Sequence, residues 1–174
     1  MKKYLRLLPL ILYPYAYIIY FILLFTINDI SEKIANLLTS GFVVLIIGYT
    51  VLTLITAISS TVLAVKGKYS AYETAKMNLA VKAWHIPAYI FHLIMFGVGM
   101  IASIWGIGFI MIAVIVDLLT IALSGINAVS CAVKLKKEGI ISKGTTILFG
   151  IGSFIYCLDL LVAIIYVFQS RKHR

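Results

Sequence analysis

Two carboxylates stand inside long apolar stretches of this sequence. Asp117 lies in the run from His85 to Val133, and Asp159 lies in the run from Thr145 to Phe168. Ionisable residues are costly in lipid and usually mark a functional site there. Two carboxylates at one depth on neighbouring helices can share a proton or a cation, because adjacent charges repel strongly in a low dielectric.

The spacing places these residues in a single layer. Asp117 lies about ten residues from the outer end of a predicted helix at about 107–133, and Asp159 lies about nine residues from the outer end of one at about 145–168. These are nearly equal depths at about 1.5 Å per residue. His92 lies on the preceding helix and could reach the same layer. The predicted site consists of Asp117, Asp159 and His92, lined by Tyr89, Tyr156, Thr120 and Ser124. In the alternative, each aspartate is neutral or bonded to hydroxyl groups and only fixes helix packing.

The composition determines what must position these side chains. The chain has 174 residues, of which 63% are hydrophobic and 12% charged, with a mean hydropathy of +1.09. A soluble core cannot absorb so much apolar surface, so we predict an all-α integral membrane helical bundle forming one transmembrane domain over residues 1–174. The net charge is +9, and the lysine and arginine residues that give it lie mainly between the apolar runs. Their positions therefore indicate contact with anionic lipid headgroups rather than with nucleic acid.

Apolar runs of about 20 residues predict five membrane-spanning helices, at about 5–27, 41–65, 84–102, 107–133 and 145–168. The first is interpreted as an uncleaved helix in which Pro9 and Pro14 leave backbone groups for neighbouring helices to cover. Residues 66–84 are predicted to be an amphipathic lead-in, with Pro87 in the first turn of the third span. Residues 103–108 are predicted to form the turn before the fourth helix. Within that helix, Gly125, Ala128 and Ala132 are small enough to permit close contact with a neighbouring helix.

The distribution of lysine and arginine predicts a cytoplasmic N-terminus. The inner segments would hold Lys2, Lys3, Arg6, Lys66, Lys68, Lys76, Lys82, Lys134, Lys136, Lys137 and Lys143, against Lys33 outside. Five spans would place Arg171, Lys172 and Arg174 outside, in conflict with the same rule. Either the loops outweigh the tail, which is the interpretation preferred from sequence, or one apolar segment does not cross completely.

Other chemistries have little support in the sequence. His85 and His92 are too far apart along one helix to bind a metal together, so no metal site and no cofactor is predicted. No nucleophile elbow, metalloprotease or nucleotide-binding motif is present, so no catalytic residue is assigned. Cys131 and Cys157 form no CxxC pair and are expected to be packing residues.

Several short motifs carry a resemblance. They are Asn78–Lys82 with His85–Tyr89, Asp117 followed by Ser124 and Gly125, Lys137–Lys143, and Phe154–Asp159. They resemble a family of small integral membrane proteins of unassigned function from low-GC Gram-positive bacteria. The resemblance covers residues from about 76 to the C-terminus, and the first two helices match no motif. It implies a multi-pass protein of the bacterial plasma membrane and assigns no activity to any residue.

Two functions remain open at this point. The first is binding or transport of a proton, a cation or a small solute at the intramembrane Asp/His site. The alternative is a non-catalytic accessory subunit of a larger membrane complex or a homo-oligomer, with the small residues of the fourth helix as the contact. A membrane enzyme would need a nucleophile and a base that the sequence does not supply.

Overall fold

The computed structural model describes residues 2–26, 32–102 and 106–173, and every regular element in these ranges is a helix. The helices are α1 (Lys2–Leu5), α2 (Leu8–Leu12), α3 (Tyr15–Thr26), α4 (Glu32–Val65), α5 (Ala71–Ile101), α6 (Gly106–Lys137), α7 (Lys143–Gly152) and α8 (Leu158–Arg171). The predicted all-α class is confirmed for these residues. Three helices in the described part are long and apolar enough to cross a membrane, namely α5, α6 and the 40–65 portion of α4.

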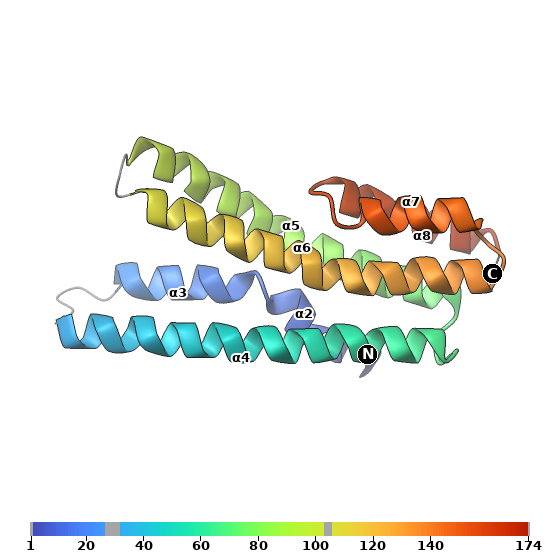
Figure 1. The fold of residues 1–174 in the computed structure, drawn as a ribbon, viewed down its shortest axis with the longest axis horizontal. Coiled ribbons are helices and arrows are strands. Elements are labelled where there is room, and N and C mark those ends of the chain that lie inside the picture. Colours follow the sequence, from blue (N-terminus) through green and yellow to red (C-terminus); the bar gives the residue numbers. More distant parts are fainter. Residues whose placement is uncertain (1, 27–31, 103–105, 174) are drawn as a thin grey trace.

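Prolines divide the first apolar segment, predicted as one helix over 5–27, into three short helices. Pro9 lies at the start of α2, where a missing N–H is tolerated. Pro14 separates α2 from α3, and it removes the donor that a continuous helix would offer to the carbonyl of Leu10. The segment nevertheless runs beside α4, as the blue ribbons of Figure 1 show.

The polar stretch before the third predicted span belongs to α5 itself. The Ser70 hydroxyl accepts a hydrogen bond from the Glu73 amide at 3.2 Å, and the Glu73 carboxylate accepts one from the Ser70 amide at 3.3 Å. This capping box starts the helix at Ala71. Pro87 therefore lies in the interior of α5, not in its first turn as predicted.

The fifth predicted span, 145–168, is an antiparallel helical hairpin in the structure (Figure 1). α7 has 10 residues and α8 has 14, and neither approaches the length of about 20 that a crossing requires. The chain reverses between Gly152 and Leu158, where Cys157 has a φ of 65°, a left-handed conformation that non-glycine residues rarely adopt. This region therefore departs from the single helix that its apolar composition predicts.

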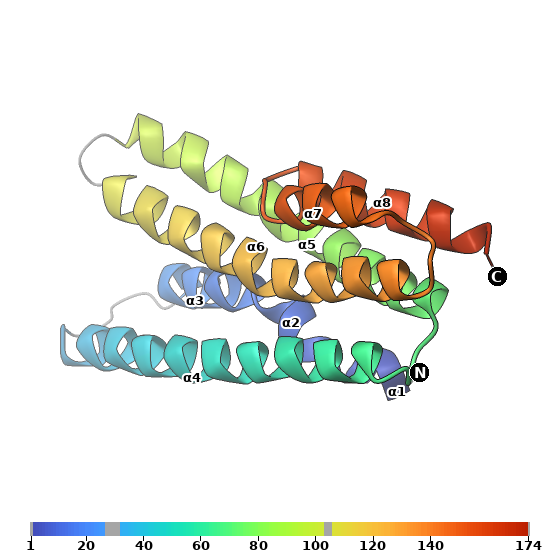
Figure 2. The same cartoon turned by 45° about the vertical axis from the view of Figure 1, so that its right-hand side comes forward.

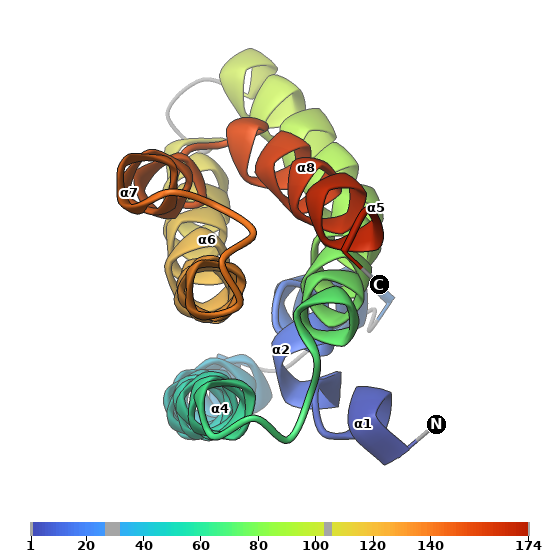
Figure 3. The ribbon, with the colours of Figure 1, turned by 90° about the vertical axis from the view of Figure 1, so that its right-hand side faces the viewer.

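The helices are arranged around the antiparallel pair α5 and α6. In the end-on view of Figure 3, α8 lies against α5 and α7 lies beside α6, whereas α4 lies on the side of this pair away from α7 and α8. Ala128 and Ala132 are completely buried, and a Cβ on Gly125 would lie 2.5 Å from the ring of Phe154. The predicted close packing of this small-residue face is thus confirmed. Of the predicted turn at 103–108, residues 103–105 lie outside the described residues, and α6 begins at Gly106.

The hairpin brings both ends of the chain to one end of the bundle, as Figure 2 shows. Lys3 binds Glu73 at 2.6 Å, and a cavity of about 390 Å³ is lined jointly by residues that include Lys3, Ser70, Glu138 and His173. Arg171, the last residue of α8, and Lys172 after it therefore lie with the other basic segments, at the end of the bundle away from the start of α4. This arrangement corresponds to the incomplete fifth span, the alternative that the sequence interpretation did not prefer.

This arrangement predicts that the two termini lie on the same side of a membrane. In a background of Cys131→Ala and Cys157→Ala, Arg6→Cys and Lys172→Cys should react with an impermeant maleimide from one side only, and Lys33→Cys from the other. All three residues are exposed. Labelling would be compared in intact cells and inside-out vesicles. Labelling of Lys172→Cys from the side of Lys33→Cys would show that the last segment crosses completely.

Candidate functional site

Lys82 and Asp159 form a buried ion pair between α5 and α8. The distance from Lys82 Nζ to Asp159 Oδ2 is 2.7 Å, and the two side chains are 1% and 2% exposed. The same ammonium donates a hydrogen bond to the Ser124 hydroxyl on α6 at 2.6 Å. Buried charges require pairing and hydrogen bonding to be tolerated in apolar surroundings. One cation therefore holds three helices together.

The chain reversal before α8 positions the carboxylate. Asp159 is the second residue of α8, where backbone N–H groups lack helical partners and the helix dipole favours a negative charge. The Leu160 amide donates to Asp159 Oδ1 at 2.8 Å, while Oδ2 receives Lys82. Both oxygens of the carboxylate are thus bonded.

His92 and Asp117 form a second acid–base pair, between α5 and α6. The distance from His92 Nδ1 to Asp117 Oδ1 is 2.5 Å, with the side chains 1% and 18% exposed. Because a carboxylate accepts, Nδ1 is the donor. The other ring nitrogen, Nε2, is buried without a hydrogen-bond partner among the described residues. When Nδ1 donates to Asp117, Nε2 is an acceptor that has no donor among the described residues.

The predicted site residues are brought together as two groups rather than one. Asp117 binds His92, whereas Asp159 binds Lys82 with Ser124 beside it. In the described part of the chain each carboxylate has its own nitrogen partner, so the proposed sharing of a proton between the aspartates does not match the geometry. Equal depth for the two aspartates requires one continuous helix over 145–168, whereas the hairpin places Asp159 at the start of α8.

The remaining predicted lining residues have different roles. Tyr89 and Tyr156 lie together, with ring centroids 5.0 Å apart. The Tyr89 hydroxyl is buried and has no hydrogen-bond partner among the described residues. Thr120 donates to the carbonyl of Val116 in its own helix at 2.7 Å, which is the structural role that hydroxyls often take in apolar helices.

Lys82 belongs to the candidate site, and the predicted site did not include it. The spacing predicts that Lys82 shares one helix face with Asn78, His85, Tyr89 and His92, but its charge was assigned to the inner basic segments as a topology signal. Residues at spacings of three and four share a helix face, and this face is buried. A lysine in register with buried polar residues, and opposite an isolated aspartate, was the available signal.

A cavity of about 440 Å³ opens between α5 and α8 and reaches the ion pair. It is lined by Lys82, Ile86, Tyr89, Ile90, Leu93, Tyr156, Cys157, Asp159, Leu160 and Leu161. Its volume falls within the range of about 300–1,000 Å³ that small-molecule sites occupy. The walls are mainly apolar, and the charged and phenolic groups supply the polar contacts.

A separate polar bridge joins α4, α5 and α6. The Asn127 amide donates to Asn78 Oδ1 at 3.2 Å, and the Ser60 hydroxyl donates to Asn127 Oδ1 at 2.9 Å. All three side chains are buried. Hydrogen bonds of this kind hold helices together where water is absent, so we assign this bridge to packing.

His85 has a structural role that the prolines explain. Its Nε2 lies 2.9 Å from the Leu10 carbonyl, the group that would accept from residue 14 in a continuous helix were that residue not Pro14. Since a carbonyl can only accept, Nε2 carries the proton. Thr53 likewise donates to the Pro9 carbonyl at 3.3 Å. The prediction that a neighbouring helix covers the backbone group freed by a proline is therefore confirmed for Pro14.

His85 and His92 consequently serve different partners. The first binds a backbone carbonyl of α2 and the second binds Asp117. Among the described residues no group of three or more His, Cys, Asp or Glu side chains is placed to hold a metal ion. The chemistry that the arrangement offers is acid–base and electrostatic.

The substitution His85→Phe should destabilise the protein by about 1–3 kcal/mol, because it leaves a buried carbonyl without a donor. In a Pro14→Ala background the new amide N–H can bond Leu10, so the same substitution should cost less. Denaturant titration of the detergent-solubilised protein measures both costs. Equal costs in the two backgrounds would show that His85 does not act through this carbonyl.

Comparison with known proteins found no match to this chain among protein-family models, curated proteins or solved structures.

Proposed function

We propose that this chain is a multi-pass protein of the bacterial plasma membrane that binds a small amphiphilic solute between α5 and α8. The apolar part of the solute occupies the 440 Å³ cavity, and its charged group contacts the Lys82–Asp159 pair. The observation that carries the proposal is the opening of an apolar cavity onto a buried ion pair. The bacterial origin follows the family resemblance of the sequence and is part of the proposal.

The outer surface of the bundle supports a membrane location. Large apolar side chains are exposed along the three long helices, among them Val44, Leu45, Leu93, Ile94, Met111 and Leu118. Such a continuous apolar exterior suits lipid and not water. The basic end of the bundle would face the cytoplasm, since lysine and arginine are enriched there.

The chemistry of the cavity supports a charged ligand with an apolar body. An ammonium group entering the cavity can bind Asp159, and a carboxylate can bind Lys82, so either charge has a partner. The Tyr89 hydroxyl, which has no partner among the described residues, can donate to or accept from the same ligand. Ile86, Ile90 and Leu93 provide the apolar contacts on α5.

A second candidate function is proton binding at the His92–Asp117 pair. The buried Nε2 of His92 favours it, because this nitrogen is the acceptor of the ring when Nδ1 donates to Asp117, and it has no hydrogen-bond partner among the described residues. The accessory-subunit alternative loses its specific basis, since the small residues Ala128 and Ala132 are buried within the chain. Their face is already occupied by internal packing.

The test of solute binding uses three probes that differ only in their polar group: hexylamine, hexanoate and hexanol. A ligand that binds the folded state raises the unfolding temperature, so thermal unfolding of the detergent-solubilised protein is the measurement. We expect stabilisation by a charged probe and little by hexanol. Substituting Ile90→Trp should fill the cavity and abolish the shift.

Ile94→Trp is the matched control, because Ile94 is 58% exposed against 55% for Ile90 and does not line the cavity. The double variant Lys82→Met with Asp159→Leu should fold and lose the preference for a charged probe. Equal stabilisation by all three probes, or a full response in Ile90→Trp, would contradict the proposal.

A further inference from the structure

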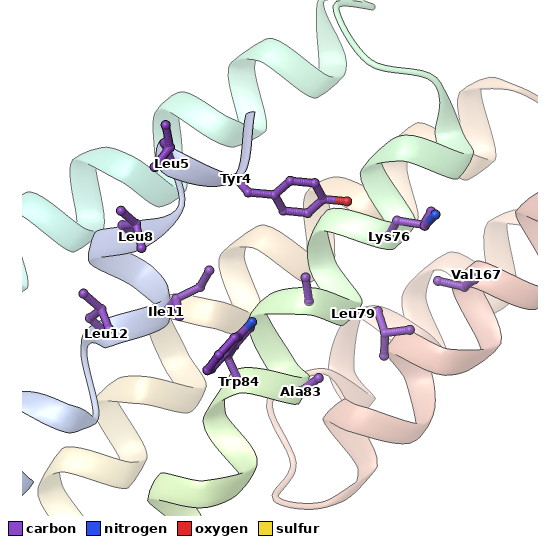
Figure 4. Close-up of a pocket in the computed structure, with 11 residues that line it drawn as sticks. Tyr4, Leu5, Leu8, Ile11, Leu12, Lys76, Leu79, Ala83, Trp84 and Val167 are labelled. Atoms are coloured by element: carbon purple, nitrogen blue, oxygen red, sulfur yellow. The ribbon is translucent and has the colours of Figure 1, made fainter. Parts of the chain in front are cut away.

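A second, larger cavity lies between the N-terminal helices and α5. Its volume is about 650 Å³, and its walls are almost entirely apolar. Figure 4 shows Leu5, Leu8 and Leu12 on one side, with Leu79 and Trp84 on the α5 side. The ion pair of Lys82 and Asp159 takes no part in it. This cavity is therefore a separate feature from the solute site.

The mouth of this cavity is polar and lies at the basic end of the bundle. Tyr4 and Lys76 line both the apolar cavity and the neighbouring polar cavity of about 390 Å³. In Figure 4 the Tyr4 hydroxyl points toward the side of α5 that carries Lys76. An amphiphile can thus place its chain among the leucines and its headgroup beside these two residues.

The charges at the mouth favour an anionic headgroup. The two glutamates of the polar cavity are already engaged, because Glu73 binds Lys3 at 2.6 Å and Glu138 binds Lys134 at 3.0 Å. In the described part of the chain Lys76 makes no ion pair, and its ammonium lies 5.3 Å from the centre of the Tyr72 ring. One cation is therefore left uncompensated where the apolar cavity meets the polar one.

We propose that this cavity binds one acyl chain of an anionic phospholipid whose phosphate contacts Lys76. The depth of the cavity agrees with this occupant, since Lys76 and Trp84 are eight residues apart, which is about 12 Å along α5. A charged group at the basic end and an apolar trough below it match the two parts of a lipid. The inference does not depend on the solute site.

Native mass spectrometry tests the proposal on the detergent-purified full chain. The protein would be mixed with equal amounts of palmitoyl-oleoyl phosphatidylglycerol and palmitoyl-oleoyl phosphatidylcholine. We expect the anionic lipid to be retained preferentially. Lys76→Gln should reduce its retention about fivefold, the effect of one lysine near an anionic lipid surface. Lys136→Gln is the matched control, because Lys136 is exposed at the same end and lines neither cavity.

Ala83→Phe tests the apolar part of the site. Ala83 is exposed and lines the cavity, so a larger side chain should exclude both lipids without disturbing the core. The variant Lys82→Met with Asp159→Leu should retain phosphatidylglycerol as the wild type does, which separates this test from that of the solute site. Equal retention of the two lipids by wild type, equal losses in Lys76→Gln and Lys136→Gln, or unchanged binding by Ala83→Phe would each overturn the proposal.

Discussion

The bundle depends on the pairing of a buried lysine with a buried aspartate. Neither Lys82 nor Asp159 can remain charged alone among apolar helices, because an isolated ion there loses its hydration without compensation. Their contact attaches α8 to α5, and the bond from Lys82 to Ser124 adds α6. This attachment holds the α7–α8 hairpin against α5 and so directs the C-terminus to the basic end of the bundle. It also places the 440 Å³ cavity beside the ion pair.

The same constraint governs the uncharged polar groups. Pro14 leaves the Leu10 carbonyl without a helical donor, and His85 supplies one from α5. Irregular backbone is tolerated at membrane depth only where protein covers it. The broken first segment is therefore bound to α5 through its defects as well as through its apolar side chains. This explains why a histidine on the polar face of α5 has a structural role while its neighbour His92 faces a carboxylate.

The sequence predicted the three long helices α4, α5 and α6, because apolar length depends only on local composition, whereas the first and fifth predicted helices are each divided in the structure. It placed Asp117 and His92 in one candidate site, and these two side chains are in contact. It failed for Asp159, because 145–168 has the apolar composition of a span, and the prediction includes Gly150 and Gly152, which precede the reversal near Cys157, in one continuous helix. The partner Lys82 was missed for a related reason, since a lysine near the end of an apolar run also fits a topology signal.

The most direct test of this account is a double-mutant cycle on the ion pair, measured as the free energy of unfolding in detergent. Asp159→Leu and Lys82→Met should each cost about 3–5 kcal/mol, because each leaves one buried charge unpaired, whereas the double variant should be close to the wild type. Additive losses, or single substitutions without effect, would contradict the claim that this pair organises the fold.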